Sequence, residues 1–338
     1  MRRKVTMQQI ADMAGVSKFA VSRALSGKTG VSEQTRAYIV KVAGELGFFE
    51  ASKQTAIRPG YHLRDAETSG TVLVLFPNIR YQNVENKYWG FIYDGISQKL
   101  QDNGLDMITL TQPFRDSVTK LFNPKMILGV ICVGTVSTQV LLELQSMELP
   151  MVMIDHIDPA IQCDGVFVDN YFMMRKLMAM LISKGYQRFQ FVGKVSYAFS
   201  FEERWRAFRD SLSEYGIVHN QLPQLMASEN LNEYEGVMSI PQEELPQIFV
   251  CANDCVALSV YDALNERGIK IPTECGVAGF DNTEDAQQLV PKLTSVHVPK
   301  EAMGARAVDR LLQRVRNRDE CYEKTLLLGD VVLKHSTI

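Results

Sequence analysis

The spacing of apolar positions changes near residue 70 and divides the chain into two parts. Before that point, apolar side chains recur every three or four residues in three short segments, as on one face of a helix. The segments are expected at 7–14, 18–25 and about 33–46. Thr6 with Gln9 forms a capping-box pattern, and Ser17 and Ser32 are suitable N-caps for the other two helices. The predicted core of this three-helix head consists of Ile10, Ala14, Val16, Val21, Leu25, Ile39, Val42 and Leu46.

After residue 70, apolar runs of strand length alternate with amphipathic segments of helix length. The runs are 72–76, 106–110, 128–133, 151–154, 189–192, 248–251 and 276–280. This alternation indicates parallel sheets with helices on both faces, and the length suits two α/β lobes. Open sheets of this kind bind ligands at the carboxyl ends of their strands, so a site is expected in the cleft between the lobes.

The net charge of −3 conceals an uneven distribution. Residues 1–60 contain ten Lys or Arg and four Asp or Glu, a balance of +6, which leaves −9 for the remainder. A basic head on an acidic body indicates that the head has a polyanionic partner. The second helix would present Lys18, Phe19, Ser22 and Arg23, and a short helix with long donors fits the major groove of DNA.

These side chains have more than one interpretation. Arg23 is suited either to guanine or to a phosphate, and Phe19 either to a thymine methyl group or to a partly buried position. An ordinary solvated face of a helical bundle is the alternative to a DNA-reading surface.

The head also resembles a known family. Residues 5–17, 21–27, 31–36 and 46–48 are similar to the helix-turn-helix head of the lactose-repressor (LacI/GalR) family of bacterial transcription regulators. The resemblance implies a DNA-binding domain over 1–49. It also implies that Lys18, Phe19 and Arg23 face bases, and that Thr6, Ser17, Ser22 and Arg36 lie near phosphates.

Residues 50–69 are expected to form a hinge or linker, and here the sequence departs from the family pattern. The family usually has Pro-Asn and then an Ala-Arg-x-Leu stretch, which folds as a hinge helix on DNA with its leucine in the minor groove. The corresponding residues of this chain are 50–51 and 54–57, followed by Arg58-Pro59-Gly60. Ile57 lies at the leucine position, so an inserted Ile57 and a plain flexible linker are both open.

The rest of the chain, 70–338, resembles the two-lobed, periplasmic-binding-protein-like (type I) effector and dimerisation domain of the same family. Its landmarks are 86–89, 155–156, 168–170, 203–204, 252–254, 279–282, 293–296 and 301–305. The resemblance implies an N-lobe of about 70–169 and 295–323, and a C-lobe of about 170–294 and 324–338. The implied effector-binding residues are Tyr88, Trp89, Asp155, His156, Arg204, Asn253 and Asp281.

Their chemistry suits a sugar-like ligand. Aromatic rings offer flat faces, Arg204 donates in a fork, Asp281 accepts, and Asn253 does both. Each residue also has a plainer interpretation. These are a core position for Trp89, a surface salt bridge for Arg204, a helix cap for Asp281, a turn brace for Asn253, a structural role for Asp155 and an ordinary loop position for His156.

Other classes of protein find little support. The sequence has no phosphate-binding loop, no G-x-S-x-G elbow and no His-x-x-x-His pair, so neither catalysis nor a metal or cofactor is indicated. Its six cysteines show no disulfide framework. The absence of a long apolar run and of a signal peptide favours a cytoplasmic protein without a membrane partner.

The sequence therefore predicts a DNA-binding transcription regulator, acting as a repressor and gated by a small molecule, with a carbohydrate favoured. A homodimer on a near-palindromic double-stranded operator is expected, because one head alone binds weakly. The alternatives are a regulator gated by a protein partner or a non-sugar metabolite, a cytoplasmic sugar-binding protein, and an enzyme with a DNA-targeting head.

Overall fold

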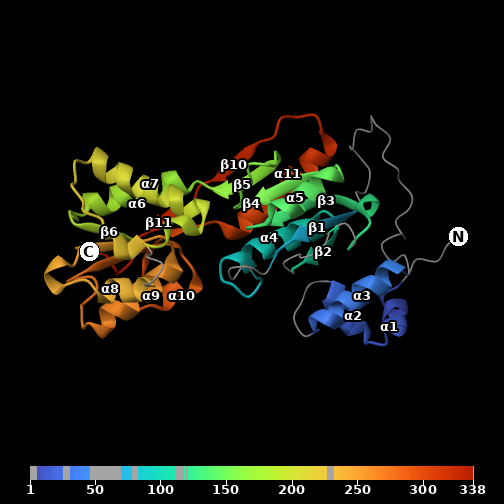
Figure 1. Cartoon of the computed structure of the whole chain (residues 1–338), viewed down its shortest axis with the longest axis horizontal. Coiled ribbons are helices and arrows are strands. Elements are labelled where there is room, and N and C mark those ends of the chain that lie inside the picture. The colour runs from blue at the N-terminus through green and yellow to red at the C-terminus, as the bar shows by residue number, and fades with distance from the viewer. Residues whose placement is uncertain are drawn as a thin grey trace. The chain divides into compact units, whose positions relative to one another are not determined.

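The computed structural model describes residues 6–25, 31–45, 70–77, 83–111, 118, 121–226 and 232–337. The chain forms two compact units (Figure 1). The first contains Met1–Phe167 and Lys300–Thr325, and the second contains Val168–Pro299 and Leu326–Ile338. The hinge stretch 50–69, with Ile57, lies outside the described residues.

The head folds as three helices, α1 (Met7–Ala14), α2 (Lys18–Leu25) and α3 (Glu33–Glu45). The capping box is confirmed, because the Thr6 hydroxyl accepts from the Gln9 N–H while the Gln9 side chain accepts from the Thr6 N–H. Gly15 ends α1 at φ 66°, a conformation that glycine adopts without steric cost. A separate small core holds the helices together and is formed by Ile10, Ala11, Val21, Ala24, Ile39, Val42 and Ala43.

The first unit is built on a six-stranded sheet in the order β10-β5-β4-β3-β1-β2. Its strands are β1 (Thr71–Leu75), β2 (Asp106–Leu110), β3 (Ile127–Val133), β4 (Met151–Ile154), β5 (Asp164–Val168) and β10 (Lys324–Leu327). The ladders from β2 through β1, β3 and β4 to β5 are parallel. The accompanying helices are α4 (Trp89–Asp102), α5 (Thr138–Ser146), α11 (Lys300–Arg316) and the short η3 (Pro124–Met126).

Helices α4 and α11 pack unusually close together in this unit. A Cβ atom on Gly304 would lie 2.1 Å from the Ile92 carbonyl oxygen, and one on Gly95 would lie 2.1 Å from the Glu301 carbonyl oxygen. The two glycines therefore let the backbones approach to a distance that any side chain would prevent.

The second unit is built on a five-stranded sheet in the order β11-β9-β8-β7-β6. Its strands are β6 (Phe189–Val192), β7 (Ile248–Cys251), β8 (Gly276–Asp281), β9 (Thr294–His297) and β11 (Asp330–Val332). Its helices are α6 (Asn170–Ser183), α7 (Phe199–Glu214), α8 (Glu233–Met238), α9 (Asp254–Glu266) and α10 (Glu284–Gln288), with η4 (Val195–Tyr197), η5 (Pro223–Met226) and η6 (Gln242–Glu244).

The predicted α/β fold is confirmed, with additional strands that the apolar pattern did not reveal. All seven apolar runs form strands, whereas β5, β9, β10 and β11 were not among them. Thr294 and Ser295 in β9 are polar yet fully buried, because their hydroxyls bond within the unit. Strand β11 runs antiparallel to β9, an exception to the expected parallel pairing at the edge of the sheet.

Within the described part of the chain, none of the helices combines the length and hydrophobicity that a membrane-crossing segment requires.

Candidate functional site

Helix α2 is held at both ends by polar contacts within the head. At its start, the Ser17 hydroxyl accepts from the Ala20 N–H at 3.1 Å, as expected for an N-cap. At its end, the Arg36 guanidinium donates to the carbonyl oxygens of Arg23 (3.1 Å) and Ala24 (2.8 Å). Arg36 therefore ties α3 to the last turn of α2, a structural role in addition to the predicted phosphate contact.

The surface of α2 carries the predicted base-reading residues. Val21 and Ala24 are buried in the head core, Lys18 and Phe19 are exposed, and Arg23 is half-buried. Phe19 is 66% exposed, so the alternative of a partly buried ring is wrong. The Arg23 guanidinium lies 5.1 Å from the centre of the Phe19 ring, within the range of a cation–π contact.

The other predicted phosphate-contacting residues lie at helix starts or on the same helix. Thr6 and Ser17 are exposed caps of α1 and α2, and Ser22 is half-buried on α2. Backbone N–H groups at helix starts favour negative charge, which suits the predicted phosphate contacts.

In the first unit, predicted effector residues gather near the ends of β1 and β4. Asn86 organises the start of α4, since its side-chain oxygen accepts from the N–H groups of Tyr88 (2.9 Å) and Trp89 (3.3 Å). The Tyr88 hydroxyl donates to Asp155 at 3.4 Å, and the Tyr88 and Trp89 rings meet edge to face at 5.0 Å. Trp89 is half-buried and also packs against Phe76, so it has a partial core role.

His156 follows Asp155 and is half-buried. Burial lowers the pKa of His156, while Asp158 and the backbone of Val136 act in the opposite direction. Its Nε2 is buried and has no hydrogen-bond partner among the described residues. A neutral imidazole is therefore favoured here near neutral pH.

Lys300 is a candidate that the sequence pattern missed. This side chain is buried at the start of α11, and its ammonium group lies 6.0 Å from the centre of the Tyr88 ring. The sequence offered one indication of a role for Lys300, its position immediately before the Glu301–Ala305 landmark. This indication was weak, because a lysine at a helix start is ordinarily solvated.

In the second unit, Arg204 on α7 is the centre of a buried polar cluster. It donates from Nε to the Asn170 side-chain oxygen (2.9 Å) and from a terminal nitrogen to the Ala252 carbonyl (2.7 Å). Its guanidinium also lies 3.5 Å from an Asp281 carboxylate oxygen and 3.7 Å from the centre of the Phe280 ring. Arg204 is only 2% exposed, so the alternative of a surface salt bridge is wrong.

Asp281 closes β8 in a left-handed conformation at φ 108° and is buried. The alternative that it caps the next helix is wrong, because the Thr283 hydroxyl accepts from the Ala286 N–H and caps α10. Asn253 does brace its turn, since its side-chain oxygen accepts from the Val256 N–H at 3.0 Å and caps α9. The Asn253 side-chain amide therefore already caps α9, and the predicted contact with a ligand would use this same amide.

Asp254, the neighbour of Asn253, is the second residue that the sequence pattern missed. One of its oxygens accepts from the Thr283 N–H (2.6 Å), and the other accepts from the Ser295 hydroxyl (2.6 Å). A Cβ on Gly279 would lie 2.4 Å from that second oxygen, so glycine leaves the space that this carboxyl occupies. Burial, with the charge of Asp281 second, raises the pKa of Asp254 to about 7.

The seven predicted effector residues thus form two groups. Tyr88, Trp89, Asp155 and His156 belong to the first unit, and Arg204, Asn253 and Asp281 to the second. Asp155, Asn253 and Asp281 each lie at or just after the carboxyl end of a strand. Parallel α/β sheets bind ligands at these ends.

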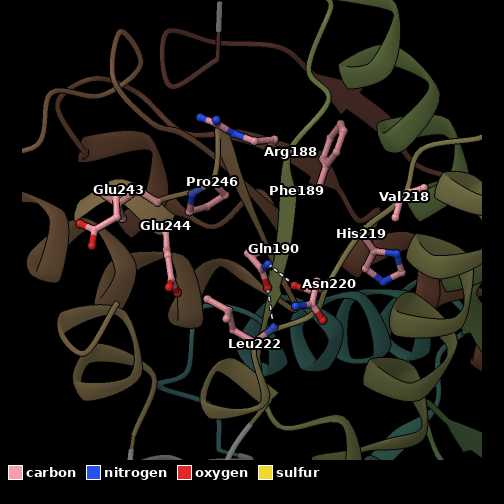
Figure 2. A pocket seen from close by; sticks show the side chains of 11 residues that line it. Arg188, Phe189, Gln190, Val218, His219, Asn220, Leu222, Glu243, Glu244 and Pro246 are labelled. Carbon is pink, nitrogen blue, oxygen red and sulfur yellow. Dashed lines mark hydrogen bonds between the residues drawn. The ribbon is translucent and has the colours of Figure 1, made fainter. Parts of the chain in front are cut away.

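A separate pocket of 390 Å³ opens in the second unit at the amino ends of β6 and β7 (Figure 2). Gln190 is already satisfied there, because its amide donates to the Asn220 carbonyl (2.7 Å) and accepts from the Leu222 N–H (2.9 Å). The Gln221 side chain bonds to the backbone N–H and carbonyl of Phe191 and so covers the edge of β6. The pocket contains none of the predicted effector residues.

Comparison with known proteins identifies both parts of the chain. Residues 6–49 match the model described as bacterial regulatory proteins, lacI family. Residues 178–337 match the periplasmic binding protein-like domain. The chain is 25% identical to a ribose operon repressor of Haemophilus influenzae, over 98% of each protein.

Two solved structures have the same fold over nearly the whole chain. One is a complex of the transcriptional regulator CelR with cellobiose, at a TM-score of 0.64 and 20% identity, covering 98% of this chain and 99% of that one. The other is the lac repressor dimer bound to operator and the anti-inducer ONPF, at a TM-score of 0.66 and 20% identity, covering 99% and 100%.

Proposed function

Because the chain belongs to the lacI family of bacterial regulatory proteins, we propose that it is a sequence-specific transcription repressor whose DNA affinity is controlled by a small molecule. The observation that carries this proposal is the exposed face of α2, where Lys18, Phe19 and Arg23 stand on a helix fixed at both ends. A regulator that acts on operator DNA works in the bacterial cytoplasm. We assign no catalytic step to its residues.

The proposed DNA-binding domain comprises residues 1–49, followed by a hinge over 50–69 that includes Ile57. Lys18, Phe19 and Arg23 enter the major groove, while Thr6, Ser17, Ser22 and Arg36 contact phosphates. The lac repressor in the similar structure is a dimer on its operator. We therefore propose a homodimer of this chain on a near-palindromic site, with one head on each half.

A salt series tests the DNA part of the proposal. The full-length chain is titrated with a random-sequence duplex between low and moderate salt, and the logarithm of the association constant is plotted against that of the salt concentration. The slope is about −0.9 for each phosphate neutralised, so a head of charge +6 is expected to give a clearly negative slope. A slope near zero would refute DNA binding.

The proposed effector is a carbohydrate. The support is chemical: Tyr88 and Trp89 present aromatic faces, and Arg204 and Asp281 form a buried donor–acceptor pair. The names of two similar proteins mention ribose and cellobiose, which places sugars first in a screen.

A thermal-shift screen tests the effector part. Ribose, cellobiose, other sugars, sugar phosphates and purines are each added to the full-length protein. A ligand at 100 times its dissociation constant stabilises the folded state by about 2.7 kcal/mol, which is readily measured as a rise in Tm. Stabilisation only by a purine would replace the sugar by a non-sugar metabolite, and stabilisation by none of them would favour a protein partner.

A further inference from the structure

Glutamine side chains hold the frame of the pocket at the amino ends of β6 and β7. The amide of Gln190 bonds to the backbone of Asn220 and Leu222, which fixes one wall. The Gln247 side-chain oxygen accepts from the Arg188 N–H at 3.0 Å, and the Arg188 carbonyl accepts from the Gln247 N–H at 2.9 Å, which fixes the other wall. Both walls therefore exist before a ligand binds, so that binding would cost little ordering of the chain.

Charged side chains at the rim of this pocket are not used by the fold. Arg188, Glu243 and Glu244 are exposed lining residues, and within the part of the chain that the structure describes their side chains form no hydrogen bond or ion pair. Glu244 lies three residues before Gln247, whose backbone bonds to that of Arg188, and the three charged side chains stand on one side of the pocket (Figure 2). One positive and two negative groups thus border a preformed hollow.

The floor and the opposite side of the pocket carry no charge. The apolar lining residues are Phe189, Leu222, Leu245 and Pro246. His219 lies across the pocket from the charged residues (Figure 2), and its ring packs edge to face on Phe208 at 5.7 Å. Burial lowers the pKa of His219, and the charge of Arg209 acts in the same direction. The imidazole is therefore neutral near neutral pH.

We propose that this pocket is a second small-molecule site, which binds a free α-amino acid with an apolar side chain. Arg188 donates to the carboxylate of the ligand, Glu243 and Glu244 accept from its ammonium group, and its side chain lies on the apolar floor. The inference goes beyond the proposed repressor function, because none of the predicted effector residues lines this pocket.

The charges and the size of the pocket lead to this assignment. An α-amino acid carries its carboxylate and its ammonium group on one carbon atom, so it needs opposite charges on the same side of a site. A guanidinium group holds a carboxylate with two parallel bonds. A purely anionic ligand would meet two carboxylates, and a purely cationic ligand would leave Arg188 unused. The cavity of 390 Å³ is near the lower end of the roughly 300–1,000 Å³ of ligand pockets, which suits a small metabolite.

Isothermal titration calorimetry of the full-length protein tests the site. The probes are L-leucine, L-leucinamide, which lacks the carboxylate, and N-acetyl-L-leucine, which lacks the ammonium charge. We expect L-leucine to bind and each analogue to bind about ten-fold more weakly, because each loses one charge-assisted interaction.

Two variants assign the charges to their partners. Arg188→Gln is expected to bind L-leucine about ten-fold more weakly and to lose the preference for L-leucine over L-leucinamide. The double variant Glu243→Gln/Glu244→Gln should instead lose the preference for L-leucine over N-acetyl-L-leucine. Lys270→Gln is the matched control, since it removes an exposed positive charge of the second unit outside the pocket, and it should keep both preferences.

A failure of this inference is distinct from a failure of the proposed function. No binding of L-leucine to the wild type, or equal binding of the three probes, would overturn the inference. Undiminished preferences in Arg188→Gln and in the double variant would overturn it as well, because the amino acid would then bind elsewhere. None of these results would alter DNA binding or the response to sugars, which the salt series and the thermal-shift screen measure separately.

Discussion

Asp254 is a buried carboxyl that joins three segments of the second unit. It begins α9, accepts from Thr283 in the loop after β8, and accepts from Ser295 in β9. Asp281, a proposed effector residue, adds a second negative charge nearby. Asp254 therefore positions the loop that carries Asp281, and its own charge is poorly tolerated.

This residue makes the stability of the protein depend on pH. Burial first, and then Asp281, raises the pKa of Asp254 to about 7, whereas an unfolded aspartate titrates near 3.9. Between those values the folded state holds a proton that the unfolded state has lost, so stability declines as pH rises and levels off above about 7. Through Asp254, the wild type is expected to lose about 3 kcal/mol of unfolding free energy between pH 5 and pH 8, and Asp254→Asn should abolish that loss.

The measurement is urea denaturation of the wild type and the variant at both pH values. Asp285→Asn, which changes an exposed carboxyl on α10, is the control and should follow the wild-type profile. A parallel decline in wild type and Asp254→Asn would exclude Asp254 as its source.

At the scale of elements, a buried ion cluster connects β5, α11 and the segment leading to β10. Asp164 accepts from Arg314 at 2.7 Å and from Arg310 at 2.9 Å, and the same Arg314 donates to the carbonyl oxygens of Glu320 and Cys321. Burial opposes ionisation of Asp164, but the bonds from Arg314 and its other donors outweigh it and lower its pKa. Arg314 thus lies in the last turn of α11 and, by these bonds, holds the segment that leads from α11 to β10 against Asp164.

Breaking this cluster on one side should be costly. We expect Arg314→Met to lower the free energy of unfolding by about 3–5 kcal/mol, because Asp164 would lose its strongest buried partner. Asp309→Ala removes the partly solvent-exposed ion pair between Asp309 on α11 and Lys99 on α4, and should cost less than about 1 kcal/mol. Equal effects of the two substitutions in urea denaturation would contradict a special role for the buried cluster.

The glycine contact between α4 and α11 makes a second prediction at this scale. Gly304→Ala places a Cβ atom 2.1 Å from the backbone oxygen of Ile92, so the helices must separate. We expect the free energy of unfolding to fall by about 1–3 kcal/mol, which is measured as a lower midpoint of urea denaturation. Gly70→Ala is the control, since its Cβ would meet Leu128 at 3.5 Å, an ordinary contact, and should leave the midpoint nearly unchanged.

At the scale of the whole molecule, DNA binding and effector binding rest on separate cores. The head has its own apolar core around Ile10 and Ile39, while Arg204 and Asp281 are buried in the second unit. The two activities should therefore be separable by single substitutions in the full-length chain.

We expect Arg23→Ala to weaken the free energy of binding to an operator duplex, selected from a random library, by about 1–3 kcal/mol. The thermal shift caused by the sugar should be kept. Arg204→Lys should do the reverse, because lysine keeps the positive charge but cannot form the forked contacts with Asn170, Ala252 and Asp281. Fluorescence anisotropy reports the first activity and thermal shift the second. Loss of both activities in either variant would show that the two are not separable in this way.

Local signals predicted much of the fold. The Thr6–Gln9 box, the Ser17 cap and the left-handed Gly15 are short-range features. Helix α1 begins and ends, and helix α2 begins, where those signals stand. The apolar runs likewise marked seven strands. Strands β5 and β9 escaped, because Asp164, Thr294 and Ser295 are polar residues that are buried only through partners distant in sequence. Strands β10 and β11 escaped because they are short edge strands whose side chains are exposed or half-buried, so they need no apolar run.

The sequence by itself determined the helix-turn-helix head, the α/β body and the resemblance to the lacI family, because capping, periodicity and motifs depend on residues close together in the chain. Only the tertiary structure decided that Arg204 is buried, that Asp281 is not a helix cap, and that Lys300 and Asp254 lie beside the predicted effector residues. The physical reason is that burial and electrostatic pairing are set by which distant segments meet. For Phe19, likewise, the sequence offered two positions for the ring, and the packing of three helices left it exposed against Arg23.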